Sequence, residues 1–425
     1  MKAIVSPSKV KGIITIPASK SAMQRACAAA LLKGGETILE NPGHSADDKA
    51  ALDIITQLGA TIKYQQDTIQ ILSEGIRPKS ETINCGESGL SVRMFTPIAS
   101  LSDKEIEITG SGSLLKRPLG FFSDVLPMIG VEFKSKNGYL PMSVKGPLKP
   151  ESITVDGSLS SQYLTGLLMA YSAIDARDVT LSVKNLNSRP YIDLTLKIMS
   201  EFGLKVPVNK NYERFYFTNE HHQLKNEGQF RFRVEADWSG GAFLLVAAAI
   251  SGEATIIGLD IDSTQADKAI LEAMKQSGVM MDLRKNEIQV KKSCIKTFEF
   301  DATDCPDLFP PLVCLASFTE GISSIKGVHR LTYKESNRAM TLQEEFGKMG
   351  IEIHLNDDVM LIKGNKKIKS AELDSHHDHR IAMACAVTAL SADNNSLINH
   401  AEAVNKSYPD FWDHLQKLTT GITLK

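Results

Sequence analysis

The chain has 425 residues, of which 42% are hydrophobic and 23% charged, and its formal net charge is −2. This is the composition of an ordinary globular protein, so it excludes a disordered or fibrous chain, and the length corresponds to two or three domains of about 150 residues. The near-neutral charge argues against a general binder of nucleic acid or membrane surfaces. We therefore expect neither as a partner, and look for a local basic pocket instead.

The cysteines and the apolar runs indicate a compartment. No Cys-x-x-Cys pair or zinc-ligand spacing occurs among the six cysteines, which are Cys27, Cys85, Cys294, Cys305, Cys314 and Cys385. Most lie in apolar runs, so we expect buried thiols in a reducing compartment. The first residues lack the layout of a signal peptide, and no apolar run reaches the ~18 residues of a membrane helix. These features predict a cytoplasmic protein without a membrane segment.

One pattern recurs six times along the chain: a short β-prone run, a polar turn, and a helix rich in Ala, Leu and Met. The turns are anchored by Ser19, Ser88, Ser160, Asp237, Asp304 and Asp378, which are 69, 72, 77, 67 and 74 residues apart. Six repeats therefore fill the whole chain. Because Ser and Asp are good N-caps, each anchor is expected to begin a helix.

A second helix follows in most repeats. We predict these helices over 47–58, 120–129, 191–202, 265–278 and 342–350, each followed by a pair of strands, as around the turn at Asn137-Gly138. Each repeat thus reads β-α-β-α-β-β. Solenoids with so long a period are unusual, so we expect two closed groups of three repeats.

Several helix starts carry arginine. Ser21 with Arg25 and Lys334 with Arg338 are each four residues apart, which is one helix face. Helix N-termini present free N–H groups and a partial positive charge, and the arginine fork suits carboxylates and phosphates. This arrangement predicts a small polyanionic substrate.

Seven motifs then point to a family. The first is Pro17-Ala-Ser-Lys20-Ser21-Ala-Met-Gln-Arg25, and six follow in order: Lys116-Arg117-Pro118, Ser160-Ser161-Gln162-Tyr-Leu-Thr, Ser188-Arg-Pro-Tyr191-Ile-Asp, Lys334-Glu335-Ser-Asn-Arg338, Asp378-His379-Arg380-Ile-Ala-Met and Lys406-Ser-Tyr-Pro-Asp. Together they resemble the 5-enolpyruvylshikimate-3-phosphate synthase family over the full length of the chain.

The resemblance implies an α/β fold, a two-domain inside-out α/β barrel with six β-α-β-α-β-β repeats, three per domain. One domain would comprise residues 1–18 and 236–425 and the other residues 19–235, with the active site in the cleft between them. The family moves the enolpyruvyl group of phosphoenolpyruvate to the 5-hydroxyl of shikimate 3-phosphate and releases phosphate, in the shikimate pathway. It needs no metal and no organic cofactor. We expect these two substrates as the partners and a monomeric enzyme.

The resemblance also implies roles for individual residues. Asp307 would accept the proton of the 5-hydroxyl, Glu335 would protonate the methylene carbon, and Lys20 would be the third catalytic residue. A neutral hydroxyl nucleophile does require such a base. The residues that would bind shikimate 3-phosphate are Lys20, Ser21, Arg25, Ser160, Ser161, Gln162, Ser188, Tyr191, Asp307 and Lys334. Those that would bind phosphoenolpyruvate are Lys20, Gly89, Arg117, Gln162, Arg338, Arg380 and Lys406.

The second repeat departs from the family pattern. Glu87-Ser-Gly89-Leu-Ser-Val-Arg93 stands where the family usually has Asn-Ala-Gly-Thr-Ala-Met-Arg. A carboxylate beside the bound phosphate would weaken binding unless it points away or pairs with Arg93. For this reason we leave Arg93 out of the predicted site.

Three alternatives stay open. The sister enolpyruvyl transferase, which acts on UDP-N-acetylglucosamine, often carries a reactive cysteine five residues before the arginine of the Arg-Pro motif, where this chain has Gly112. The run His376-His377-Asp378-His379 offers metal-ligand types, although adjacent side chains diverge at a helix start. A non-catalytic relative is the third alternative, but it would be expected to lack Lys20, Asp307 or Glu335.

Overall fold

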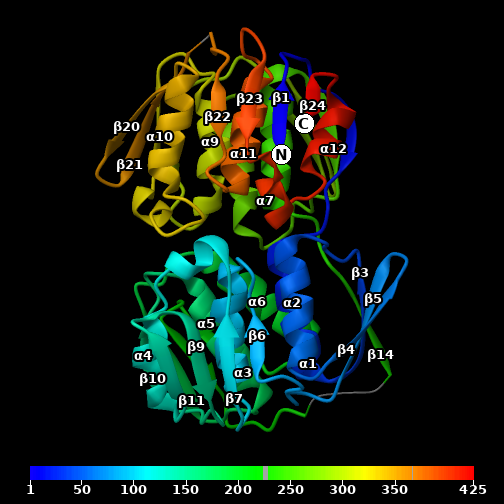
Figure 1. The fold of residues 1–425 in the computed structure, drawn as a ribbon, viewed down its shortest axis with the longest axis vertical. Helices are drawn as coiled ribbons and strands as arrows, with labels where there is room; N and C mark the ends of the chain where they lie inside the picture. Colours follow the sequence, from blue (N-terminus) through cyan, green and yellow to red (C-terminus); the bar gives the residue numbers. More distant parts are fainter. Residues whose placement is uncertain (224–227, 366) are drawn as a thin grey trace. The chain divides into compact units, whose positions relative to one another are not determined.

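The computed structural model describes residues 1–223, 228–365 and 367–425. The chain divides into two compact units (Figure 1). Residues 18–234 form one of them, which we call the continuous unit. Residues 1–17 and 235–425 form the other, which we call the split unit. Both crossings between the units lie one residue before the boundaries expected from the sequence.

The described residues form six four-stranded sheets, three in each unit, on one plan. In every sheet the first two strands are parallel, and the third and fourth each run antiparallel to the strand before. The continuous unit holds the sheets β14 (Gln229–Arg233)–β3 (Gly35–Glu40)–β5 (Thr68–Ser73)–β4 (Thr61–Gln65), β6 (Thr82–Asn84)–β7 (Glu105–Thr109)–β9 (Tyr139–Lys145)–β8 (Glu132–Lys136), and β10 (Ile153–Asp156)–β11 (Val179–Lys184)–β13 (Arg214–Phe217)–β12 (Val208–Lys210).

The split unit repeats this plan, with its strands drawn from both of its segments. Its sheets are β2 (Lys11–Thr15)–β15 (Glu253–Ile257)–β17 (Glu287–Lys291)–β16 (Met280–Arg284), β18 (Glu299–Asp301)–β19 (Ile322–Lys326)–β21 (Val359–Lys363)–β20 (Glu352–Asn356), and β22 (Glu372–Asp374)–β23 (Ser396–Asn399)–β1 (Lys2–Val5)–β24 (Ile422–Leu424).

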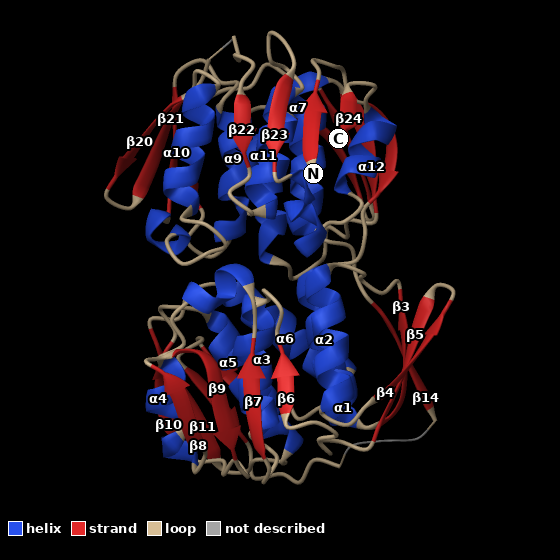
Figure 2. Ribbon diagram, viewed as in Figure 1, coloured by secondary structure: helices blue, strands red, loops and turns tan. Residues whose placement is uncertain are grey.

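Helices fill the interior of each unit, and the sheets lie around them (Figure 2). Helices that are apolar on nearly all sides belong in a core. Accordingly, α7 (Trp238–Ser251) buries almost every residue, and α1 (Lys20–Lys33), α3 (Gly89–Ala99) and α5 (Ser161–Ala173) bury most of theirs. The helices of the continuous unit are α1 (Lys20–Lys33), α2 (Ala46–Gln57), α3 (Gly89–Ala99), α4 (Phe121–Val125), α5 (Ser161–Ala173) and α6 (Arg189–Glu201), with 3₁₀ turns η1 (Gly112–Lys116) and η2 (Pro127–Ile129). Those of the split unit are α7 (Trp238–Ser251), α8 (Ile270–Gln276), α9 (Phe309–Ala316), α10 (Arg338–Lys348), α11 (His379–Ala389) and α12 (Phe411–Leu418), with η3 (Ala266–Ala269), η4 (Pro306–Leu308), η5 (Val328–Leu331) and η6 (Ala401–Lys406).

The two crossings of the chain exchange one strand between repeats. Strand β2 directly precedes α1 in the sequence, yet it pairs with β15 of the split unit. Strand β14, which precedes α7, takes the corresponding place beside β3 in the continuous unit. The first strand and the first helix of a repeat therefore belong to different units at each crossing.

Five of the six anchors cap a helix as predicted. The side chains of Ser19, Ser88, Ser160, Asp237 and Asp378 each accept a backbone N–H from the first turn of their helix. The prediction for Asp304 is wrong. Helix α9 begins at Phe309 behind the 3₁₀ turn η4, and its N-cap Leu308 makes no side-chain cap. The prolines at 306, 310 and 311 have no N–H, so fewer donors there need a cap.

The thiols are buried as expected except at one position. Five of the six cysteines are buried and Cys294 is exposed, and all six are free. Among the described residues, no helix has the length and hydropathy needed to cross a bilayer.

Candidate functional site

A group of acids and bases gathers in the split unit, where the starts of α10 and α11 meet η4. Asp307 lies in η4, Arg338 is the first residue of α10, and Lys334 and Glu335 lie in the loop before it. Asp378 caps α11, and Arg380 is the second residue of that helix. We call these six residues the acid–base cluster.

Asp307 lies among three cations. Its Oδ1 accepts from Arg338 Nη1 at 2.7 Å and from Lys334 Nζ at 3.1 Å, and its Oδ2 lies 3.2 Å from Arg380 Nη2. Burial alone would raise the pKa of this carboxyl, but the nearby charges of Arg380, Lys334 and Arg338 outweigh it and hold the pKa well below the usual range. Asp307 is therefore ionised, although only 20% of its side chain is exposed.

Arg338 is held by three carboxylates. Its Nε and Nη2 donate to the two oxygens of Asp378 at 2.8 and 3.2 Å, and Nη2 also donates to Glu335 Oε2 at 2.7 Å. The side chains of Arg338 and Asp378 are 1% and 0% exposed. Burial opposes the charge of the guanidinium, but Asp378, Glu335 and Asp307 raise its pKa above the ordinary value. Arg338 therefore stays charged, and its one guanidinium holds both Glu335 and Asp307 in place.

A fourth carboxylate, that of Asp267, lies close to the acid–base cluster. Asp267, in η3, is 1% exposed, and its Oδ2 accepts from the hydroxyl of Ser239 at the start of α7. Burial and the charge of Asp307 raise the pKa of Asp267 to about 7. Two neighbouring carboxyls with pKa values shifted in opposite directions are typical of acid–base sites.

A second group lies in the continuous unit, at the starts of α3 and α5. Arg93 Nη1 donates to Gln162 Oε1 at 2.9 Å, and its guanidinium lies 5.2 Å from the centre of the Tyr163 ring. A Cβ on Gly89 would come within 2.9 Å of Nη1 of both Arg93 and Arg117, so a glycine is needed for the two guanidiniums to approach this helix start. We call Gly89, Arg93, Arg117 and Gln162 the anion cluster, because a helix N-terminus and two arginines favour an anion.

The starts of α1 and α6 hold a third group, in the same unit. Arg25 is 1% exposed and donates from Nε to Thr195 Oγ1 at 2.9 Å, from Nη1 to the carbonyl of Ser21 at 2.9 Å, and from Nη2 to the carbonyl of Tyr191 at 3.4 Å. Burial lowers the pKa of Arg25 to about 10, so it is still charged. Lys20 Nζ lies 3.1 Å from Asp47 Oδ2.

Comparison with known proteins identifies the family. The sequence model of EPSP synthase (3-phosphoshikimate 1-carboxyvinyltransferase) matches residues 4–415. The chain is 34% identical over 424 residues to the 3-phosphoshikimate 1-carboxyvinyltransferase of Clostridium novyi, covering 97% of this chain and 96% of that protein. A second relative with the same description, from Clostridium acetobutylicum, is 34% identical over 419 residues, with the same coverage.

The chain belongs to the EPSP synthase family. Solved structures agree on the fold. An EPSP synthase from Acinetobacter baumannii superposes with a TM-score of 0.82 at 23% identity, over 99% of both chains. The enolpyruvyl transferase NikO from Streptomyces tendae superposes with a TM-score of 0.76 at 16% identity, over 99% of this chain and 98% of the other. The family and the fold class predicted from the sequence are confirmed.

The predicted site residues of this EPSP synthase family member fall into the three groups described above. In the split unit the structure brings together Asp307, Lys334, Glu335, Arg338 and Arg380, while Lys406 is buried on η6, which packs against α11. In the continuous unit, the helix starts carry the others: Lys20, Ser21 and Arg25 on α1, Gly89 on α3, Ser160, Ser161 and Gln162 on α5, and Ser188 and Tyr191 on α6. Arg117 is the C-cap of η1. The roles assigned to these residues stay predictions.

Sequence reasoning missed four residues at these groups. The repeat pattern identifies Asp378 only as a helix cap, whereas its carboxylate also accepts two hydrogen bonds from Arg338. The acidic Glu87 argues against Arg93 as a site residue, although Arg93 donates a hydrogen bond to Gln162. Asp47 had a usable signal, since it is an acid in the first turn of a helix in the same unit as Lys20. No sequence pattern indicates Asp267 as a site residue, because its proximity to Asp307 follows from tertiary packing alone.

The structure also bears on the sister transferase. Gly112 has a left-handed φ of +54°, and a Cβ there would lie 2.3 Å from the carboxyl carbon and Oε1 of Glu87. No L-residue with a side chain fits without a shift of Glu87. The position where that sister often carries its reactive cysteine therefore leaves no room for one here.

The histidine run does not converge on one point. Asp378 is bound to Arg338, His379 is buried at the start of α11, and His376 Nε2 lies 2.7 Å from Glu345 Oε1. Glu344, Glu345 and His376 do bring potential ligand atoms within 4.8 Å of one another. However, Lys348 Nζ lies 2.8 Å from Glu345 Oε1 and 3.5 Å from Glu344 Oε1, so an ammonium already supplies the positive charge there.

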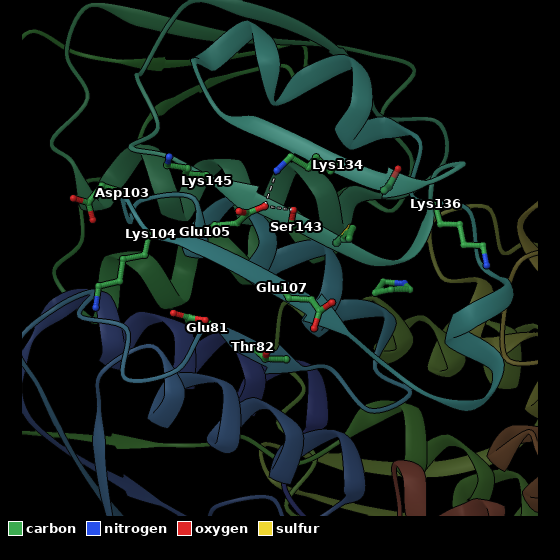
Figure 3. A pocket seen from close by; sticks show the side chains of 13 residues that line it. Glu81, Thr82, Asp103, Lys104, Glu105, Glu107, Lys134, Lys136, Ser143 and Lys145 are labelled. Atoms are coloured by element: carbon green, nitrogen blue, oxygen red, sulfur yellow. Dashed lines mark hydrogen bonds and ion pairs between the residues drawn. The ribbon is translucent and has the colours of Figure 1, made fainter.

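A surface hollow in the continuous unit lies apart from the predicted residues (Figure 3). It is lined by outward side chains of the sheet β6–β7–β9–β8 and its connections, among them four lysines and four acids: Lys104, Lys134, Lys136, Lys145, Glu81, Asp103, Glu105 and Glu107. Lys134 Nζ and Ser143 Oγ each donate to Glu105 Oε1 at 2.9 Å. The balanced charges do not favour a polyanionic ligand there.

Proposed function

We propose that the protein transfers the enolpyruvyl group of phosphoenolpyruvate to the 5-hydroxyl of shikimate 3-phosphate and releases inorganic phosphate. In this reaction the hydroxyl oxygen forms a bond to the central carbon of the enolpyruvyl group, and the bond from that carbon to the phosphate oxygen breaks. The observation that carries the proposal is the acid–base cluster, in which Asp307 and Glu335 share one arginine. Membership of the family supports it.

The cations around Asp307 would tune it as the base. In the free protein, Arg380, Lys334 and Arg338 hold the pKa of Asp307 well below its usual range against the effect of burial, which makes the carboxylate a weak base. A bound substrate anion would share these cations with Asp307 and weaken their hold on it. The proton affinity of Asp307 would therefore rise when phosphoenolpyruvate and shikimate 3-phosphate are both in place, which is when a base is needed.

Glu335 would supply a proton to the methylene carbon as the hydroxyl adds to the central carbon, and it would take a proton back from the resulting methyl group as phosphate leaves, so that the enol double bond forms again. It is held at 2.7 Å by Arg338, the arginine that also holds Asp307, so the acid and the base keep a fixed spacing. Protonation makes the central carbon electrophilic, and the leaving phosphate is stabilised by cationic groups. Lys20, kept in place by Asp47, would assist at the leaving group.

We assign the phosphoenolpyruvate anion to Arg117, Gly89 and Gln162 of the anion cluster together with Lys20, Arg338, Arg380 and Lys406. Shikimate 3-phosphate would be bound by Lys20, Ser21, Arg25, Ser160, Ser161, Gln162, Ser188, Tyr191, Asp307 and Lys334. Because each set draws on both units, we propose that the two units are the two domains of the enzyme and that the substrates are bound between them. Small-angle scattering with and without shikimate 3-phosphate tests this, and an unchanged radius of gyration would count against it.

The deciding experiment is phosphate release from phosphoenolpyruvate, with shikimate 3-phosphate or UDP-N-acetylglucosamine as the acceptor and a metal chelator present. We expect release with shikimate 3-phosphate only, at a rate that the chelator does not change. Asp307→Asn should lower kcat by about 10²–10⁴-fold, the usual contribution of a general base. Release with the other acceptor would reassign the protein to the sister activity, and release with neither would reject the proposal.

The same proposal places the enzyme in the cytoplasm as a monomer. Sedimentation equilibrium of the whole chain measures its mass against 46.5 kDa. A mass twice that value would reject the monomer.

A further inference from the structure

Buried side-chain hydrogen bonds tie the start of α3 to α1 in the continuous unit. Gln24 Oε1, on α1, accepts from the hydroxyls of Ser88 and Ser91, each at 3.0 Å. Ser88 is the N-cap of α3, and its hydroxyl also accepts from the backbone N–H of Ser91 at 3.1 Å. All three residues are fully buried. Gln24 therefore holds in place the helix start that carries Gly89 and Arg93 of the anion cluster.

Further hydrogen bonds lead from α3 through α5 and α6 back to α1. Arg93 on α3 donates to Gln162 on α5 at 2.9 Å. Thr165, also on α5, bonds to Thr195 on α6, with 3.0 Å between the hydroxyl oxygens. Arg25 on α1 donates from Nε to Thr195 Oγ1 at 2.9 Å. These ties form a closed loop over four helices that pack against one another, and we call it the helix ring: Gln24, Arg25, Ser88, Ser91, Arg93, Gln162, Thr165 and Thr195.

The hydroxyl of Thr195 uses its full bonding capacity in this ring. A hydroxyl has one proton and two lone pairs. Thr195 donates its proton to the carbonyl of Tyr191 at 2.8 Å, so it accepts from both Arg25 and Thr165. Both threonines are fully buried, and a buried polar group that loses its partner is costly. The ties of the ring are therefore not readily exchanged for other contacts.

The helix ring joins helix starts to which we assign different substrates. Ser21 and Arg25 on α1 and Tyr191 on α6 would bind shikimate 3-phosphate, whereas Gly89 on α3 would lie at the phosphoenolpyruvate anion. Two substrates react fast only when the reacting atoms are held in line, and a misplacement of about 1 Å can cost about 10²-fold in rate. The distance between these helix starts therefore matters for the reaction, and the ring fixes it within this unit.

We propose that Gln24, Thr165 and Thr195 are positioning residues that set the spacing between the helix start assigned to phosphoenolpyruvate and those assigned to shikimate 3-phosphate. This inference rests on the proposed function. None of the three residues is assigned to either substrate. Because the ring is closed, opening it at one tie releases the constraint on the spacing, and opening a second tie adds little to that release.

Closure of the ring makes a prediction that separate local contacts do not. Gln24→Met opens the ring between α1 and α3, Thr165→Val opens it between α5 and α6, and both nearly keep the side-chain volume. Each should lower kcat about tenfold and change either KM less than about threefold, because each substrate keeps its own contacts. In the double variant kcat should lie less than about threefold below that of the slower single variant, whereas independent effects would multiply to about a hundredfold.

Thr96 on α3 offers a matched control in the same unit. It is fully buried like Thr165, but its hydroxyl donates to the carbonyl of Val92 in its own helix. Thr96→Val removes the same group without opening the ring, so kcat should stay within about twofold of the wild type. Thermal unfolding of every variant shows whether the fold is kept.

A milder variant tests the ring if Gln24→Met does not fold. Ser91→Ala removes one of the two hydroxyls that donate to Gln24 and leaves the Ser88 cap in place. It should lower kcat about threefold, and combining it with Thr165→Val should again cost less than the product of the two single losses.

Amide hydrogen exchange separates this inference from the proposed function, because it needs no substrate. Gln24→Met should speed exchange about threefold or more in the second turns of α5 and α6, although its own ties go only to α3, and Thr96→Val should not. If the wild type turns over but the kcat losses multiply in the double variant, or Thr96→Val loses as much as Thr165→Val, the positioning role is rejected and the proposed function stands. Faster exchange confined to α1 and α3 would also reject it. If the wild type releases no phosphate, the proposed function fails, and the exchange result alone decides whether the ring couples the four helices.

Discussion

Removing the buried carboxylate of Asp378 should destabilise the split unit strongly. Asp378 is 0% exposed, accepts two hydrogen bonds from Arg338 at 2.8 and 3.2 Å and one from Ser336 Oγ at 3.1 Å, and caps α11 through the N–H of Arg380 at 3.0 Å. Breaking a buried ion pair by deleting one partner costs about 3–5 kcal/mol. Because Arg338 keeps Glu335 and Asp307, we take the lower end, about 3 kcal/mol. The lost cap adds about 1 kcal/mol.

The expected loss for Asp378→Ala is therefore about 4 kcal/mol in the free energy of unfolding. Asp378→Asn keeps one acceptor oxygen, so its loss should be smaller. Both tryptophans, Trp238 and Trp412, are buried in the split unit, so tryptophan fluorescence during urea unfolding reports on that unit alone.

The control for this prediction is an exposed ion pair in the same unit. Lys363 Nζ lies 3.0 Å from Glu352 Oε2, with side chains 56% and 59% exposed. Glu352→Ala should cost less than about 1 kcal/mol, as exposed pairs do. If Asp378→Ala destabilises no more than Glu352→Ala, the reasoning that Asp378 anchors Arg338 is refuted.

Three further predictions concern single positions. Gly89→Ala places a Cβ 2.9 Å from two guanidiniums, and overpacking of about 1–3 kcal/mol should raise KM for phosphoenolpyruvate by about 5- to 150-fold in initial-rate assays; an unchanged KM would contradict the anion cluster. Burial and Asp307 raise the pKa of Asp267 to about 7, so the folded state binds more protons than the unfolded state between about pH 4 and 7, and wild-type stability falls as pH rises through that window. The free energy of unfolding of Asp267→Asn, measured with urea, should therefore rise relative to that of the wild type as the pH goes from 4 to 8. A difference between the two proteins that stays constant over this range would argue against the raised pKa of Asp267. Asp47→Asn removes the negative charge that lies 3.1 Å from Lys20 Nζ, and it should lower kcat/KM about tenfold with little change in the thermal midpoint of unfolding. If the loss of kcat/KM comes with a comparable loss of stability, the Lys20–Asp47 pair is only structural.

The fold class was predictable because local signals and the repeat agree. Caps at Ser19, Ser88 and Asp378 mark the buried helices, and the recurring order of elements indicates six similar sheets. The exchange of β2 and β14 between the units could not be read from the pattern. Both strands carry the same β-prone signal, and which parallel neighbour each joins is decided by tertiary packing rather than by its own residues.

The candidate site was predictable only in part. The resemblance to the family points to Asp307, Glu335 and Arg338, and the structure brings these three together. The orientation of Glu87 was not predictable, because it depends on the left-handed backbone of Gly112, 25 residues further along the chain. The raised pKa of Asp267 was not predictable for a similar reason, because Asp307, which contributes to it, is 40 residues away in the sequence.

The strand exchange has a consequence for the order in which the chain folds as it is synthesised. The continuous unit draws all twelve of its described strands from residues 35–233, so its three sheets can close once that segment has left the ribosome. Strand β2 must wait for β15 at residues 253–257, and β1 must wait for β23 at residues 396–399. The earliest residues made are thus among the last to pair. Because such long-range pairing is slow and domains otherwise fold from the N-terminal end, the continuous unit should form first while residues 1–17 stay unpaired beside it.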